Sequence, residues 1–314
     1  MAHPAIATFA RLANGPAKAI RTIAGQNTKI ARSIHDMAYD PDRDEIYVMQ
    51  TRMDAVQVFK GTADGDVPPV RMIYGPKTQI RTVNEAVGRL CLDLENHELY
   101  LPNGFKVLVF DQYAQGDVPP KRVLLGPPPH DLEAGPAGGK RGLMYASTCT
   151  VDPVHDLLII SGRSLGWGRR LNVFDGVENP NQRDSLDGGE SVGQLLIFDR
   201  TASGDAKPLR VIRGDKTMLS YTQMLMTNYP PKGWIFAAVW GSEFAGTAQS
   251  SDRALVGVFS IYDNGNVAPR WTIGGPNGVL KQARGVTLDV QHKTVIVSDK
   301  KLNGVFSFEF PEVF

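Results

Sequence analysis

One spacing recurs along the chain and constrains its fold more than any other feature. It consists of Phe, Gly six residues later, Arg six residues after that, and Gly four residues further. Repeated spacings are sought first because each copy marks one structural unit. Four copies are complete and the last has Trp in the Arg position: 9–25, 59–75, 110–126, 198–214 and 259–275. Five copies predict a serial repeat architecture.

Each copy predicts a β-hairpin. The residues that lead to the Phe alternate around β-branched and aromatic types (VQVFK, VLVFD, LLIFD), which is typical of strands. The first Gly lies in a turn, where it can adopt a positive φ, and a Pro fixes φ as the chain leaves that turn. A second short strand (VRMIYG, KRVLLG, LRVIRG) then ends at the second Gly.

A further hairpin precedes each copy, as in MAYDPDRDEIYV and CTVDPVHDLLII. An Asp closes its first strand at four equivalent positions, and an Asn takes that position in the divergent fourth unit: Asp40, Asp93, Asp152, Asp289 and Asn228. Such short polar side chains accept hydrogen bonds from the turn that follows them. We expect these residues to cap turns rather than to catalyse.

Four strands per unit, with no amphipathic helix, predict an all-β chain: a β-propeller of four-stranded antiparallel blades. Residues 1–314 would form one domain. Residues 19–25 are expected to supply the last blade's fourth strand and so close the ring. Phe9 and Phe308 both fit the third-strand position, so six blades are the alternative if residues 5–9 form an edge of their own. The predicted five blades span 31–75, 86–126, 145–214, 221–275 and the segment from 284.

The GDVPPxR turn and the DPxHDxLxV hairpin resemble those of NHL-like repeat β-propellers, whose bacterial members are mostly uncharacterised. The resemblance covers nearly the whole chain and implies the propeller fold. It leaves chemistry open, because related propellers include lactonases, lyases and binding platforms. Lactonase-like members hold calcium near the axis. Here the polar residues near the starts of first strands are Asp36, Asn84, Glu85 and Gln223. They do not occupy equivalent positions in their units, so no metal site is predicted.

Composition excludes some partners and leaves others open. A net charge of +1 argues against nucleic acid, and no apolar run approaches the length of a membrane span. The N-terminus lacks a signal-peptide pattern, so the chain is cytoplasmic as written, or exported if a signal peptide was removed. Cys91 and Cys149 lie at different offsets from their turn Asp, which predicts opposite faces and no disulfide. Cofactor and oligomeric state stay open.

Function in propellers gathers where loops meet at the starts of the first strands. These loops are rich in Arg, whose planar fork suits carboxylate or phosphate groups. His35 begins the first blade and, together with Glu85, is the candidate for acid–base catalysis. The insert 161–193 departs most from the repeat and offers Trp167 between two glycines. The predicted ligand-binding residues are Arg32, Arg81, Arg89, Tyr145, Trp167, Arg169, Tyr221, Gln223, Glu243 and Arg284.

Three functional hypotheses follow. The first is a binding platform that presents this loop-rich, Arg-rich face to a small anionic ligand or a partner protein. The alternative is an enzyme, a lyase or lactonase-like hydrolase, with its site at the mouth of the central channel. A third is an oligomer subunit that docks through a free strand at 5–9 or 313–314.

Overall fold

The computed structural model describes residues 4–31, 34–81, 89–104, 106–125, 145–163, 193–219, 225–239 and 254–314. The chain divides into two compact units, one made of Met1–Gly104 with Leu108–Arg122, and the other of Phe105–Val107 with Val123–Phe314. The expectation of one domain over the whole chain stays a prediction.

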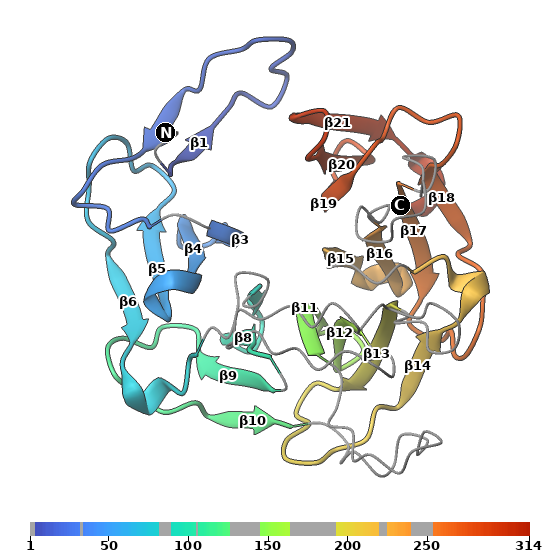
Figure 1. The fold of residues 1–314 in the computed structure, drawn as a ribbon, viewed down its shortest axis with the longest axis horizontal. Helices are drawn as coiled ribbons and strands as arrows, with labels where there is room; N and C mark the ends of the chain where they lie inside the picture. The colour runs from blue at the N-terminus through green and yellow to red at the C-terminus, as the bar shows by residue number, and fades with distance from the viewer. Residues whose placement is uncertain are drawn as a thin grey trace, which may run out of the picture. The chain divides into compact units, whose positions relative to one another are not determined.

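Strands pair antiparallel in chain order within each sheet, so that every sheet is a meander (Figure 1). The first blade comprises β3 (Ile34–Asp40), β4 (Glu45–Gln50), β5 (Ala55–Lys60) and β6 (Arg71–Tyr74). The second comprises β7 (Cys91–Asp93), β8 (Glu98–Pro102), β9 (Val107–Asp111) and β10 (Arg122–Leu124). The third comprises β11 (Tyr145–Asp152), β12 (Leu157–Arg163), β13 (Gly193–Asp199) and β14 (Arg210–Arg213). The fourth comprises β15 (Met226–Tyr229), β16 (Trp234–Val239), β17 (Leu255–Ser260) and β18 (Trp271–Gly274). The last comprises β19 (Ala283–Asp289), β20 (Thr294–Asp299) and β21 (Gly304–Glu309).

These sheets confirm the prediction of an all-β chain made of five consecutive propeller blades. The helices of the described residues are single 3-10 turns: Thr51–Met53, Pro76–Thr78, Asp215–Thr217, Pro230–Lys232 and Pro311–Val313. None of the helices in the described part of the chain is long and apolar enough to cross a membrane.

The N-terminal strand finds a different partner from the expected one. Residues 19–25 were expected to complete the last blade, but β2 (Arg21–Ile23) pairs with β1 (Ile6–Thr8), and the last sheet has three strands. The other edge of β2 forms a parallel bridge between Ile23 and Gly65. Residues 6–8 therefore occupy the position of a third strand beside β2. This is the arrangement expected if residues 5–9 form an edge of their own.

In four repeats, the first Gly joins its blade to the strand that precedes the blade. The Gly65 N–H donates to Thr22 O at 2.8 Å, and the Ala24 N–H donates to Gly65 O at 3.1 Å. Gly116, Gly204 and Gly265 make the same pair of bonds to the preceding fourth strand. All four have φ between +56° and +78°, a region that favours Gly. We call this pair of backbone bonds the Gly bridge.

The second Gly of the repeat makes room for a side chain of the following blade. A Cβ on Gly25, Gly75 or Gly214 would lie 2.3–2.6 Å from the Cγ of Asp66, Asp117 or Asn266 respectively. These side chains accept backbone N–H groups just beyond the Gly, as Asp117 Oδ1 does from Lys77 at 2.7 Å. These Asp and Asn turn residues thus bond the chain segment that follows the preceding fourth strand.

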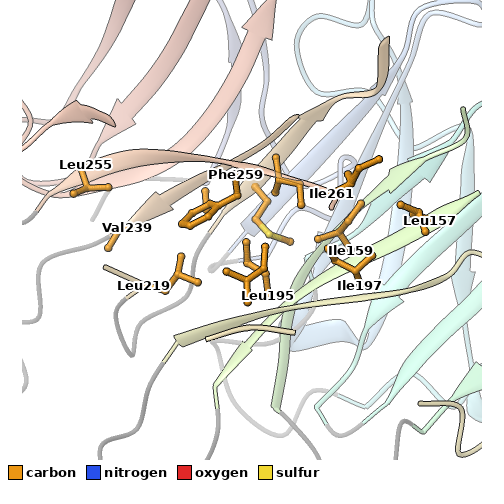
Figure 2. Packing of buried hydrophobic residues seen from close by; sticks show 13 residues of the cluster. Leu157, Ile159, Leu195, Ile197, Leu219, Val239, Leu255, Phe259 and Ile261 are labelled. Atoms are coloured by element: carbon orange, nitrogen blue, oxygen red, sulfur yellow. The ribbon is translucent and has the colours of Figure 1, made fainter. Parts of the chain in front are cut away.

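The hydrophobic core lies between neighbouring blades. The repeat residues Phe59, Phe110, Phe198 and Phe259 are fully buried, whereas Phe9 is 51% exposed. Figure 2 shows the core between the third and fourth blades, which contains Leu157, Ile159, Leu195, Ile197, Leu219, Val239, Leu255, Phe259 and Ile261. The third and fourth blades therefore bury apolar faces against each other, and the fourth and last blades do the same.

The repeat Arg forms a buried ion pair in the first two blades. Arg71 Nη1 and Nη2 donate to Glu45 at 3.0 and 2.6 Å, and Arg122 donates to Glu98 at 2.8 and 2.6 Å. The hydrogen bonds from Arg71 outweigh burial and lower the pKa of Glu45 to about 2. In the fourth blade, Trp234 and Trp271 occupy the positions of this Glu and Arg. Their rings pack edge to face, with the ring centroids 5.2 Å apart.

The turn-capping prediction is confirmed for the four Asp residues. Each accepts a backbone N–H two or three residues later, as Asp93 Oδ1 does from Asn96 at 3.0 Å. Asn228 differs, because its Oδ1 accepts from Thr150 and its Nδ2 donates to Val151 O of the third blade. The divergent fourth unit uses this position to contact its neighbour.

The prediction about the cysteines was wrong. Cys91 and Cys149 are both disulfide-bonded, and neither is a free thiol. Alternation decides which side of its own sheet a residue faces. It does not decide whether two residues of different sheets can approach, so the argument from opposite faces did not apply.

The first prediction tests the room that the second Gly provides. Gly75→Ala should destabilise the protein more than Gly116→Ala, although both have a positive φ. The positive φ costs Gly116→Ala about 1–2 kcal/mol. Gly75, at φ +117° and ψ +168°, lies in a region essentially restricted to Gly, where Ala costs about 1–3 kcal/mol. Gly75→Ala also displaces Asp117 and loses its hydrogen bond to Lys77, which adds roughly 1–3 kcal/mol. Urea unfolding measures both losses, and equal losses would contradict the assignment.

The second prediction concerns acid stability. Glu45 has a pKa of about 2 in the folded protein against an ordinary 4.5, so its ion pair stabilises the fold above pH 4.5 and is lost as the pH falls toward 2. Glu45→Gln should cost roughly 3 kcal/mol at pH 7 and far less near pH 2. The exposed Glu95→Gln is the matched control. Urea unfolding at both pH values gives the comparison, and a constant deficit of Glu45→Gln would contradict it.

Candidate functional site

Three first strands carry an irregularity at the same place. In β3 the register passes from Ile34–Gln50 to Met37–Val48, so His35 and Asp36 stand opposite one residue. In β11 the extra residue is Ser147, and in β19 it is Arg284. Such β-bulges bend a strand and redirect side chains, and they are over-represented next to active sites.

The bulges fall at a fixed distance from the turn Asp. His35, Ser147 and Arg284 each lie five residues before the Asp that ends their strand. Gln223 occupies the corresponding place before Asn228, outside the described residues. Four residues before the Asp, the first two blades place opposite charges: Asp36 and Arg89. We call these two positions of each blade the bulge positions.

The chain reaches the bulge positions along a fixed route. After the second Gly, a buried Thr hydroxyl donates back to the Gly carbonyl at 2.6 Å, as Thr28, Thr78 and Thr217 do. A side chain at or near the end of the second strand then accepts backbone N–H groups of the loop, as Gln50, Asn103 and Asp299 do. The residues held in this way lie three residues before β3 (Ala31), ten residues before β7 (Arg81) and directly before β19 (Gln282).

Asp36 and Arg89 form the charged part of this site in the first unit. Arg89 is 1% exposed and acts electrostatically on Asp36. Among the described residues, the one hydrogen bond of Asp36 is to its neighbour, the Met37 N–H, at 2.9 Å. Burial raises the pKa of Asp36 to about 7, although Arg89 and the Met37 N–H act in the opposite direction. Asp36 therefore titrates near neutrality beside a buried cation.

Arg284 is the charged residue of the bulge in the second unit. It is partly buried, and desolvation lowers the pKa of its guanidinium. The loop before it is held by Asp299, which accepts the backbone N–H groups of Lys281 and Gln282 at 2.7 Å each. Burial acts to raise the pKa of Asp299, and four backbone N–H donors together lower it.

The structure describes the side chains of three predicted site residues. Arg89 and Arg284 occupy bulge positions, whereas Arg81 is exposed in the preceding loop, where its N–H donates to Asn103. The other predicted residues lie outside the described residues, His35 and Tyr145 by their side chains only: Arg32, His35, Glu85, Tyr145, Trp167, Arg169, Tyr221, Gln223 and Glu243. Within the described part of the chain, no cluster of His, Cys, Asp and Glu can hold a metal ion.

Sequence reasoning considered Asp36 only as a neighbour of His35 and as a possible metal ligand. A signal for it was present, because counting back four residues from each turn Asp aligns Asp36 with Arg89. The bulges themselves carry no such signal, since an extra residue in a strand looks like any other.

Comparison with known proteins supports the fold and no more. No family model matches the chain, and no curated protein matches it either. Among solved structures, the chain is similar to the hydrazine synthase of Kuenenia stuttgartiensis, with a TM-score of 0.54 and 9% sequence identity. The similarity covers 94% of this chain and 68% of that one. At this identity it shows a shared β-propeller fold.

The third prediction follows from the raised pKa of Asp36. Because the folded pKa is about 7 and the ordinary value 3.8, Asp36 favours folding below pH 3.8, and this stability is lost as the pH rises through 7. Asp36→Asn mimics the protonated acid, so it should be more stable than the wild type at pH 8, by roughly 1–4 kcal/mol, and similar near pH 4.

Urea unfolding at pH 4 and pH 8 measures this difference. Asp42→Asn, an exposed change in the turn after the same strand, is the control and should show no such pH dependence. A wild type as stable as Asp36→Asn at pH 8 would contradict the assignment.

Proposed function

We propose that the protein is an NHL-like β-propeller that acts as a binding platform and takes a small anionic ligand at the bulge positions of its first strands. The observation that carries the proposal is the burial of Arg89 two residues before a first strand. Removing a guanidinium from water is costly. Arg89 has partners within the protein and acts electrostatically on Asp36, and an anionic ligand would join these groups.

Two features support the ligand class. Arg presents a fork of donors that matches carboxylate and phosphate oxygens. In the second unit, Arg284 is a further desolvated cation, at the other bulge position of its blade. These cations favour an anion over a neutral or cationic ligand.

A partner protein is the other ligand that the sequence allows on this face. The residues predicted to contact it are Trp167 and Arg169 of the insert, with Glu243 in the next long loop. An exposed Trp beside Arg is typical of the residues that contribute most to protein interfaces.

Catalysis is the second candidate function, and Asp36 is the residue that favours it. A carboxyl whose pKa is about 7 is suited to general acid–base chemistry at neutral pH. A lyase or hydrolase built on this site would use Asp36 in the role that sequence analysis gave to His35 and Glu85.

The fourth prediction tests anion binding directly. Acetate, succinate and inorganic phosphate are titrated into the wild type, Arg89→Gln and Arg284→Gln by calorimetry and thermal unfolding. At least one anion should bind the wild type and raise its Tm, and Arg89→Gln should weaken that binding at least tenfold, because a buried charge-assisted contact is lost.

Arg213→Gln is the matched control, since Arg213 is exposed on a fourth strand. Arg89→Lys keeps the charge without the fork and should bind with intermediate affinity. The proposal fails if no anion binds the wild type, or if Arg89→Gln and Arg213→Gln bind equally well.

A further inference from the structure

We infer that the protein forms a two-fold symmetric dimer, in which the free edge of β21 pairs antiparallel with β21 of a second copy. This surface is separate from the bulge positions, and the inference does not depend on the proposed function. β21 is the outermost strand of the last sheet, which has three strands where the complete blades have four (Figure 1). Among the described residues, β20 is the one strand that pairs with β21.

The free edge of β21 presents the backbone groups of Val305, Ser307 and Glu309. The Phe310 N–H donates to Lys293 O at 2.9 Å, in register with the pairing of β20 and β21. Successive residues of an antiparallel strand direct their backbone groups to opposite edges, so every second residue from Phe310 bonds β20. The N–H and C=O groups of the residues between them point to the free edge. Such a row is a template for an added strand.

The side chains of this edge are exposed where the complete blades bury them. Val305, three residues before Phe308, is 71% exposed. The residues three before the Phe of the complete blades are at most 1% exposed: Val56, Val107, Leu195 and Val256. Ser307 is also exposed, whereas the residues directly before that Phe are buried: Val58, Val109, Ile197 and Val258. An edge with both Val and Ser suits a surface that is wet in the free chain and covered on association.

The charges at the two ends of β21 favour a second copy as the partner. Lys301 lies in the turn before the strand and Glu309 ends it, and both side chains are exposed. An antiparallel copy brings Lys301 of each chain toward Glu309 of the other, and the two-fold axis makes this contact twice. Opposite charges on neighbouring strands stabilise their pairing, whereas a parallel copy would bring like charges together.

Sedimentation equilibrium over a wide range of protein concentration measures the Kd of the dimer. The wild type should pass from monomer to dimer without larger species, because a two-fold contact closes on itself. Amide hydrogen exchange, followed by NMR, should become slower at Val305, Ser307 and Glu309 as the dimer forms.

Ser307→Pro tests the backbone pairing. Proline removes the Ser307 N–H, which points away from β20, so the sheet of each chain should stay folded. The dimer loses two symmetry-related donors, and its Kd should rise roughly tenfold or more. Ser307→Ala is the matched control, because it removes the hydroxyl and keeps the N–H, and its Kd should equal that of the wild type. Thermal unfolding confirms that each variant is folded.

Charge reversal tests the antiparallel orientation without changing the backbone. Lys301→Glu and Glu309→Lys should each raise the dimer Kd roughly fivefold, because each places like charges together across the axis. The double variant Lys301→Glu/Glu309→Lys restores opposite charges and should dimerise like the wild type.

Three results would overturn the inference. The first is a chain that stays monomeric at every concentration. The second is a dimer that Ser307→Pro weakens no more than Ser307→Ala, or whose double charge variant is no tighter than the single ones, since it would use another surface or orientation. The third is an open-ended series of oligomers, which indicates that the edge of β21 binds a different strand of the next copy.

Discussion

The structure depends on a backbone contact that links one blade to the next. In four of the five repeats, the turn Gly bonds the preceding fourth strand through both its N–H and its carbonyl. At three of these turns, the Asp or Asn directly after the Gly reaches further along the same chain, into the space left by the second Gly. An isolated hairpin forms backbone hydrogen bonds only between its own two strands. This contact instead gives the outermost strand of one blade a partner in the next, which limits its exposed edge.

The same contact places the candidate site. The loop that leaves the second Gly is held by its own Thr and then by an acceptor near the end of the following second strand. These bonds hold Ala31 three residues before β3 and Gln282 directly before β19, close to the bulge positions of those strands.

Much of the fold could be predicted because the repeat residues act locally. Phe59 and its equivalents mark buried third strands, and Asp40 and its equivalents cap their own turns. What could not be predicted depends on contacts between blades. Asp66 looks like a turn residue but bonds the preceding blade, and Asn228 bonds Thr150 rather than its own turn. The N-terminal strand likewise brings its own partner, because residues 6–8 fit the third-strand place.

The site was harder to predict than the fold because the charge balance gives no hint of it. A near-neutral chain contains many Arg residues, and burial separates Arg89 from exposed Arg81 only in three dimensions. Sequence analysis considered Asp36 because it follows His35. The pKa of Asp36 is raised by its environment in the fold, which the neighbouring sequence does not reveal. The insert carries no repeat, so no periodicity relates Trp167 or Arg169 to the blades.

The most direct test of the account is the titration of Asp36 itself. The ¹³C chemical shift of its carboxyl carbon can be followed with pH in the protein without added anions, and Asp36→Asn identifies the resonance. The account predicts a titration near pH 7, with the carboxyl largely protonated at pH 6. A titration near the ordinary value of 3.8 would show a solvated or ion-paired carboxylate, which contradicts a neutral acid beside Arg89.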